Sequence, residues 1–159
     1  MNWTMVKHLL QTILRARRKG LLFLKRADHS IGLECLGGDC GLCCDILGSG
    51  VTANEAEART LGEEFIVKTG GLFILKSSGS ACCLLKDKFC SRYNDRPKGC
   101  REYPWYNIDG QLYYDSGCPG ITRDRDDRPA ARSLNPFEKY LPGIPKMPHH
   151  QVKKTLTAE

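Results

Sequence analysis

The sequence predicts a small α+β, loop-rich domain with a flanking N-terminal amphipathic helix. Three observations lead to this fold class. The chain of 159 residues is long enough for one compact domain with tails, yet only 41% of its residues are hydrophobic. It contains 16 glycines and 8 prolines, which favour turns. It also contains nine cysteines, all between positions 35 and 118. We therefore expect a core that is small for the length of the chain.

Residues 3–24 are predicted to form the N-terminal helix, with Gly20 as a break or kink. Apolar residues recur there at helical spacing, namely Val6, Leu9, Leu10, Ile13 and Leu14. Residues 1–27 carry seven basic side chains and no acidic one, whereas the whole chain has a net charge of only +6. The simpler interpretation is a packed helix with a solvated basic face. The alternative is a surface that binds acidic lipid, nucleic acid or an acidic partner. We expect a protein partner for this helix and no specific nucleic acid.

The segment between the two cysteine groups predicts one helix and one hairpin. Thr52-Ala-Asn-Glu55 has the capping-box pattern that starts a helix, and Gly62 is its predicted end. Residues 64–68 and 72–76 are predicted to be the strands of a β-hairpin, because Thr69-Gly-Gly71 between them is a turn sequence.

The last third of the chain predicts a short helix, a turn and a strand. Arg96-Pro97 begins the helix, because proline is favoured at early helical positions. Asn107-Ile-Asp-Gly110 is a turn that leads into a strand at 111–114. From Thr122 the chain is charged and then proline-rich, and it is predicted to be a mobile tail after about Tyr140.

These elements predict three parts of the chain. Residues 1–30 are the basic amphipathic helix, and residues 31–122 are a cysteine-cluster domain. Residues 123–159 are a charged, proline-rich extension that is partly disordered.

The number and setting of the cysteines indicate a reducing compartment. A secreted disulfide scaffold is usually shorter and has an even number of cysteines. The apolar run Leu21–Leu24 is too short for a signal peptide, and no segment approaches the roughly 18 apolar residues of a membrane span. We therefore expect a cytoplasmic protein without a transmembrane segment, in which clustered cysteines bind metal or carry out redox chemistry.

The stretch Cys35-Leu-Gly-Gly-Asp-Cys-Gly-Leu-Cys-Cys44 has the strongest chemical signal. Cys40 and Cys43 are three residues apart in a glycine-rich turn, so both thiolates can point at one ion. Cys43 and Cys44 are neighbours, and neighbouring side chains tend to point apart. They are expected to serve two separate sites or two metals of one cluster, or else one of them is a buried apolar thiol.

Four motifs follow one another along the chain: Cys35-x4-Cys40-Gly-x-Cys-Cys44, Cys82-x-x-Leu85, Cys90-x-x-Tyr93-x-x-Arg96-Pro97-x-x-Cys100-Arg101-x-Tyr-Pro104, and Cys118-Pro-Gly120. Together they resemble the YkgJ-type cysteine cluster family, a zinc- or iron-chelating domain. A similar cluster occurs in flagellin lysine N-methylases. The resemblance covers residues 35–120, about half of the chain.

This resemblance implies eight metal ligands: Cys35, Cys40, Cys43, Cys44, Cys82, Cys90, Cys100 and Cys118. Cys83 stands where the family commonly has proline, so it is the predicted surplus thiol, although an exchange of Cys82 and Cys83 stays open. Arg96 and Arg101 occupy matched motif positions. They are expected to help bind the cofactor by donating to sulfur or to neighbouring carbonyls, which compensates the negative charge of the thiolates.

The cofactor is predicted to be an iron–sulfur cluster or zinc, because all-thiolate sites suit both. The short spacing of Cys40, Cys43 and Cys44 with a Cys-Pro pair nearby favours iron–sulfur slightly. Since the apolar core is small, the domain is expected to be metal-nucleated.

The predicted function is that of a metal-binding protein with a redox or accessory role. One alternative is a cluster-dependent enzyme related to protein lysine N-methylases, and another is a structural zinc module that presents the basic helix to a partner. No catalytic residue is identified, because the chain has no nucleotide loop, no GxGxxG and no Ser-His-Asp pattern. Whether the protein is an enzyme is left open.

Overall fold

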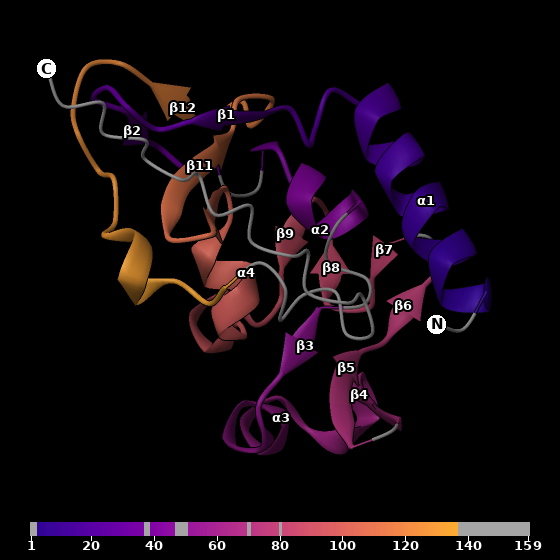
Figure 1. Ribbon diagram of the computed structural model, residues 1–159. Coiled ribbons are helices and arrows are strands. Elements are labelled where there is room, and N and C mark those ends of the chain that lie inside the picture. Colours follow the sequence, from indigo (N-terminus) through magenta and orange to yellow (C-terminus); the bar gives the residue numbers. More distant parts are fainter. Residues whose placement is uncertain (1–2, 37–38, 47–50, 70, 80, 137–159) are drawn as a thin grey trace, which may run out of the picture.

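The protein is a small mixed α/β domain (Figure 1). The computed structural model describes residues 3–36, 39–46, 51–69, 71–79 and 81–136. The helices within these ranges are α1 (Trp3–Arg18), α2 (Leu42–Ile46), α3 (Glu55–Leu61) and α4 (Lys98–Glu102). The tail predicted after Tyr140 lies outside the described residues. In the described part of the chain, no helix is long and apolar enough to cross a membrane.

One antiparallel sheet and a short strand pair lie at the upper left of the molecule in Figure 1. Its strands are β1 (Leu24–Arg26), β11 (Gln111–Asp115) and β10 (Trp105–Ile108), in this order. The separate pair consists of β2 (Gly32–Leu33) and β12 (Ile121–Thr122). The predicted turn between β10 and β11 is confirmed, because the Asn107 side chain accepts a hydrogen bond from the Gly110 amide at 3.0 Å.

A second antiparallel sheet lies below α2 and α4 in Figure 1. Its strands are β3 (Thr52–Ala53), β5 (Leu72–Leu75) and β4 (Ile66–Thr69). Strands β4 and β5 form the predicted hairpin. Two small hairpins follow, formed by β6 (Ser77–Ser78) with β7 (Ala81–Cys82) and by β8 (Leu85–Lys86) with β9 (Phe89–Cys90).

The N-terminal helix is shorter than predicted. It ends at Arg18, and residues 24–26 form β1, which pairs with β11. The break predicted at Gly20 is present, since Gly20 has a φ of 83° and Leu22 has a φ of 60°, both outside the helical region. The amphipathic character of the helix as a whole stays a prediction.

The start of α3 was predicted two residues too early. Thr52 lies in β3, and the N-cap is Asn54. Its side chain accepts a hydrogen bond from the Glu57 amide while the Glu57 carboxylate accepts one from the Asn54 amide, which is a complete capping box. The predicted end is correct, because Gly62 is the C-cap.

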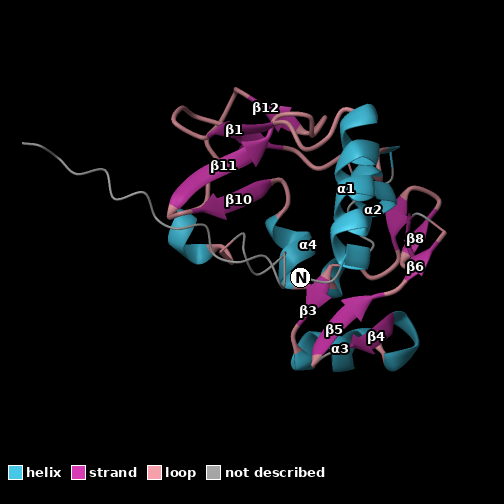
Figure 2. Cartoon of the chain, turned by 45° about the vertical axis from the view of Figure 1, so that its right-hand side comes forward, coloured by secondary structure: helices cyan, strands magenta, loops and turns pink. Residues whose placement is uncertain are grey.

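The apolar core consists of three clusters. The first contains Leu61, Leu75, Cys82, Leu84 and Cys90. The second contains Ile31, Trp105, Tyr114 and Leu134. The third contains Ala16, Leu21 and Ile46 and joins α1 to α2. Figure 2 shows these two helices side by side.

The charged segment after β12 pairs largely with itself. Arg125 pairs with Asp127, and Arg128 pairs with Asp126 at 2.7 Å. The Arg128 guanidinium lowers the pKa of Asp126 to about 2.

Candidate metal centre

Seven of the nine cysteines line one cavity of about 130 Å³. They are Cys35, Cys40, Cys43, Cys44, Cys90, Cys100 and Cys118. They come from separate elements, namely the loop after β2, the helices α2 and α4, the strand β9 and the loop after β11. None of the nine cysteines, all within the described residues, is in a disulfide. The fold thus collects thiols that are up to 83 residues apart in the sequence.

The short helix α2 lies in the segment for which the sequence predicts a glycine-rich turn. It carries Cys43 and Cys44 into the cavity. Gly41 precedes it with a φ of 64°, and a Cβ at this position would lie 2.6 Å from the Lys88 carbonyl oxygen. Only glycine fits this close approach, which brings α2 against the turn between β8 and β9.

Cys44 contacts two other thiols of the cavity. It shares hydrogen bonds with Cys43 and Cys90, and these bonds lower the pKa of both neighbours and raise the pKa of Cys44. The Arg96 guanidinium also lowers the pKa of Cys43 and Cys90. Cys43 and Cys44 are adjacent in the sequence, and both line the same cavity.

Burial is the largest influence on the pKa of Cys100 and of Cys118. It raises the pKa of Cys100 to about 12 and the pKa of Cys118 to about 11. Cys82, Cys43 and Cys90 raise the pKa of Cys100 further through charge repulsion, so these four sulfur atoms lie within electrostatic reach of one another.

Cys82 at the end of β7 and Cys83 in the turn after it have different surroundings. Cys82 is buried, its pKa is raised to about 11 by burial, and it interacts electrostatically with Cys90. The Cys83 thiol donates to the Phe65 carbonyl at 3.9 Å. Neither residue lines the cavity, but Cys82 is the one that acts on Cys100.

Arg96 places a positive charge at the cavity. Its guanidinium lies 3.5 Å from the ring centroid of Tyr93, and its Nε donates to the Tyr93 carbonyl at 2.7 Å. The Tyr93 phenol hydrogen-bonds to Cys35, which raises the pKa of this tyrosine. Sequence reasoning missed the role of Tyr93, although the residue is part of the Cys90-x-x-Tyr93 motif.

Arg101 also lines the cavity, but its donors point elsewhere. One nitrogen donates to the Arg96 carbonyl, and the other lies 3.4 Å from Glu57 Oε1. Of the two arginines predicted to assist the cofactor, Arg96 therefore acts on the thiols and Arg101 supports the backbone of Arg96.

Asp115 and Tyr103 form a second group beside the cysteines, which sequence reasoning did not identify. Asp115 is fully buried and accepts hydrogen bonds from the amides of Leu22 at 2.6 Å, Phe23 at 3.0 Å and Gly117 at 3.0 Å. It also accepts one from the Tyr103 hydroxyl at 3.2 Å. Burial, followed by the Asp115 charge, raises the pKa of Tyr103. Tyr103 hydrogen-bonds to Cys118 as well, which links Asp115 to the cluster.

The thiols line the same cavity, but they do not have the arrangement of ligands around a metal ion. Among the described residues, no group of three or more His, Cys, Asp or Glu side chains forms a ready-made metal site. The chemistry of the donor set nevertheless fits a soft metal centre, because seven thiols line the cavity together with Arg96 and Arg101, and thiolates are preferred ligands of zinc and of iron–sulfur clusters.

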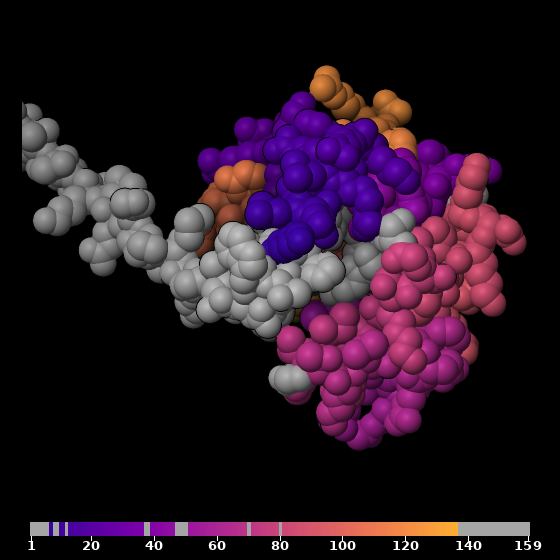
Figure 3. All heavy atoms as spheres, turned by 90° about the vertical axis from the view of Figure 1, so that its right-hand side faces the viewer, coloured from indigo at the N-terminus to yellow at the C-terminus, as the bar shows by residue number. Residues whose placement is uncertain are grey.

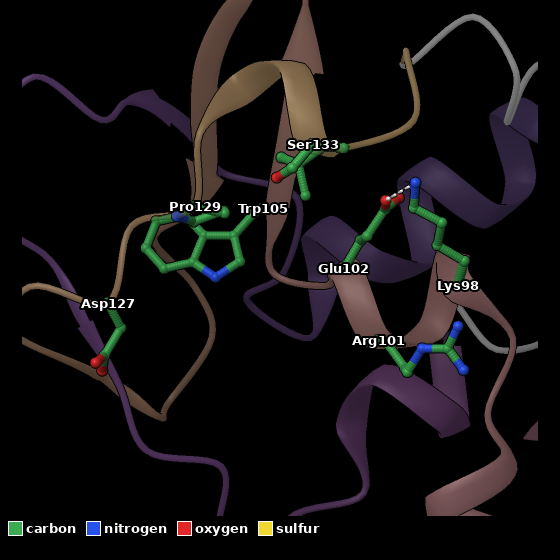
Figure 4. Close-up of a pocket in the computed structure, with 8 residues that line it drawn as sticks. Lys98, Arg101, Glu102, Trp105, Asp127, Pro129 and Ser133 are labelled. Carbon is green, nitrogen blue, oxygen red and sulfur yellow. Dashed lines mark ion pairs between the residues drawn. The ribbon is translucent and has the colours of Figure 1, made fainter.

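A second hollow of about 410 Å³ lies between α4 and residues 127–134 (Figure 4). It is larger than the cysteine cavity, but no thiol lines it. Figure 4 shows Lys98 and Glu102 paired at its edge, with Nζ and Oε1 at 3.4 Å, and Trp105 and Pro129 on the opposite side. Its chemistry offers nothing for a soft metal, so the candidate centre is the cysteine cavity.

A cavity lined by seven thiols is typical of a cysteine-rich metal-binding domain. Residues 34–119, more than half of the chain, match the family model CxxCxxCC, described as "putative zinc- or iron-chelating domain". The chain belongs to this family, which confirms the resemblance to the YkgJ-type cysteine cluster proteins, and it is a metal-binding protein of the zinc or iron class. No curated protein and no solved structure matches the chain.

Proposed function

We propose that the cysteine cavity holds an iron–sulfur cluster, with zinc as the alternative, and that the protein has a redox or metal-handling role. The observation that carries this proposal is the convergence of seven cysteines on one cavity. One shared cavity, with adjacent Cys43 and Cys44 both facing it, favours a centre with several metal atoms, because neighbouring thiols can then bind different atoms.

The proposed ligands are the eight cysteines that the sequence motifs contain: Cys35, Cys40, Cys43, Cys44, Cys82, Cys90, Cys100 and Cys118. The interaction of Cys82 with Cys100 supports the choice of Cys82 over Cys83. Arg96 stabilises the thiolates by charge, since it already lowers the pKa of Cys43 and Cys90. Arg101 supports the position of Arg96 through its hydrogen bond to the Arg96 carbonyl.

The proposal is tested by anaerobic purification, followed by an absorption spectrum and elemental analysis of one sample. A brown protein with broad visible absorbance and about four or eight iron atoms, with matching sulfide, is the expected result. A colourless protein with about two zinc atoms and no iron would contradict the iron–sulfur assignment.

Matched cysteine variants test the ligand assignment in the same sample. Cys90→Ser should lose most of the bound metal. Cys83→Ser should retain it, because the Cys83 thiol donates to a carbonyl outside the cavity. Equal metal loss in both variants would contradict the choice of ligands.

A structural zinc module is a second candidate, supported by the packing of α1. Arg15 donates to the Ile46 carbonyl at 3.3 Å, and Lys19 pairs with Asp45, so the basic helix is attached to the helix that carries Cys43 and Cys44. In such a module the metal would hold α1 in place for a partner. Zinc in the purified protein, no redox activity, and loss of partner binding on deletion of residues 1–27 with the metal retained would favour it.

A cluster-dependent enzyme related to protein lysine N-methylases is the third candidate and rests on the family resemblance. Incubation of the metal-loaded protein with a methyl donor and candidate protein lysines tests it directly. The proposed location is the cytoplasm. The proposed domain runs over residues 31–122, a choice supported by the pairing of β2 with β12 at its two ends.

A further inference from the structure

The outer face of α1 exposes two leucines that no described part of the fold covers. Leu10 is 53% exposed and Leu14 is 56% exposed. They are four residues apart, so they lie one above the other on the helix surface. Ala16 on the opposite face is completely buried against Leu21 and Ile46. The helix is therefore anchored on one side and presents an apolar ridge on the other. Figure 3 shows α1 at the surface of the molecule.

Basic side chains border this ridge on both sides. The helical period places Arg17 along one edge of the leucine pair and Lys7 and Arg18 along the other. All three are exposed, and no acidic side chain within the described residues forms an ion pair with them. The first 27 residues contain no acidic residue at all. The surface thus combines apolar side chains with uncompensated positive charge.

Phe23 extends the same surface beyond the end of the helix. It is 41% exposed, and the Arg17 guanidinium lies 4.7 Å from its ring centroid. Its amide and that of Leu22 donate to the buried Asp115 carboxylate, which fixes the turn that holds the ring outward. Leu10, Leu14 and Phe23 with Lys7, Arg17 and Arg18 are called the α1 patch below.

We propose that the α1 patch docks the protein on an anionic lipid surface. Such a surface offers both things that the patch requires, an apolar interior for the leucines and phenylalanine and acidic headgroups for the bordering cations. A nucleic-acid duplex offers phosphates but leaves two exposed leucines without a partner. Docking would place α1 between the lipid surface and α2, the helix that carries Cys43 and Cys44.

Vesicle flotation of the purified full chain tests this proposal. The protein should float with vesicles of phosphatidylcholine and phosphatidylglycerol, and not with vesicles of phosphatidylcholine alone. High salt should weaken the binding, because the exposed cations are screened.

Two double variants separate charge from apolar contact. Arg17→Gln with Arg18→Gln should weaken binding on the order of 20-fold, about fivefold for each cation. Leu10→Ser with Leu14→Ser should weaken it about tenfold, since each side chain loses part of its transfer free energy into lipid. Metal content and the urea midpoint of both variants should match those of the wild type.

Matched controls remove the same groups elsewhere on the surface. Val67→Ser with Leu72→Ser removes two exposed apolar side chains from the β4–β5 hairpin, and Arg123→Gln with Arg132→Gln lowers the net charge by the same amount. Both controls should bind vesicles within about twofold of the wild type.

Several results would overturn the proposal. The first is that the protein does not float with anionic vesicles. An unchanged affinity after the double leucine substitution, or an equal loss in the Arg123/Arg132 control, would indicate binding by overall charge alone. Binding of an acidic polypeptide or of duplex DNA that depends on Arg17 and Arg18, without binding to vesicles, would assign the α1 patch to a different partner.

Discussion

Removal of the Asp115 carboxylate should destabilise the protein strongly. Asp115 is fully buried and accepts four hydrogen bonds, three from the amides of Leu22, Phe23 and Gly117 and one from the Tyr103 hydroxyl. These bonds connect the end of β11 to the segment between α1 and β1, and to the wall of the cysteine cavity.

The size of the effect follows from the number of donors left without a partner. A hydrogen bond to a charged group contributes about 1.5–3 kcal/mol, and the contributions of neighbouring bonds do not add fully. We expect Asp115→Ala to lower the free energy of unfolding by about 4 kcal/mol. Asp115→Asn should lower it by about 2–3 kcal/mol, since the amide oxygen still accepts from some of these donors. Tyr103→Phe removes the hydrogen bonds of the hydroxyl to Asp115 and to Cys118 and should lower it by about 1–2 kcal/mol.

Urea denaturation of the three variants, at equal metal loading, measures this series. Asp124→Ala is the matched control, because Asp124 is exposed and its loss should change the free energy of unfolding by less than about 0.5 kcal/mol. If Asp115→Ala does not fold, Asp115→Asn and Tyr103→Phe still test the reasoning. Values for both within about 0.5 kcal/mol of the wild type would refute it.

Three further predictions concern the backbone, the cavity charge and pH. A Cβ on Gly117 would lie 1.7 Å from the Gly20 carbonyl oxygen, so Gly117→Ala should lower the free energy of unfolding by about 3 kcal/mol or more. Gly79→Ala, whose Cβ would meet open space, should lower it by about 1 kcal/mol. Equal losses of the two variants in urea denaturation would contradict this reasoning. Arg96→Gln should weaken metal binding at least about tenfold in competition with a chelator, and Arg96→Lys should restore part of it. Metal affinity should rise with pH through the neutral and alkaline range, because bound thiols must lose their protons and burial raises the pKa of Cys100 to about 12; a flat pH profile in the same competition assay would contradict thiolate binding.

Elements that depend on local chemistry were predictable from the sequence. Gly62 ends α3 because glycine fits the C-cap, and Asn107 closes the turn before β11 because its side chain reaches the Gly110 amide. The β4–β5 hairpin follows from its turn residues for the same reason. In each case the deciding contact lies within four residues of the one that signals it.

Elements that depend on distant contacts were not predictable. Thr52 has the right chemistry for an N-cap, but its pairing with Ile74 places it in a strand, so Asn54 takes that role. Leu24, the last residue of the predicted N-terminal helix, begins β1 instead, because it pairs with Asp115 across the domain. Local propensity was overruled in both by strand pairing over 22 residues or more.

The same division holds for the candidate site. The order and spacing of the cysteines indicated a metal centre, and the structure brings seven of them to one cavity. The position of Arg96 was also signalled by its motif. Asp115 carries no comparable signal, since a single acidic residue after a strand is common and its burial is seen only in the folded chain. Tyr103 is part of the quoted motif, but its hydrogen bond to Asp115 is seen only in the structure.

The three apolar clusters of the core meet at the cysteine cavity, and this arrangement predicts how metal affects folding. Cys90 of the first cluster, Leu33 beside the second and Leu42 beside the third all line the cavity. Each cluster alone is small, so thiols bound to one metal centre would cross-link segments that apolar contacts hold only weakly. We therefore expect chelation to lower the urea midpoint and to reduce the cooperativity of unfolding. Circular dichroism during urea titration, with and without a strong chelator, measures the effect. An unchanged, cooperative transition in the metal-free protein would mean that the apolar clusters suffice to hold the fold.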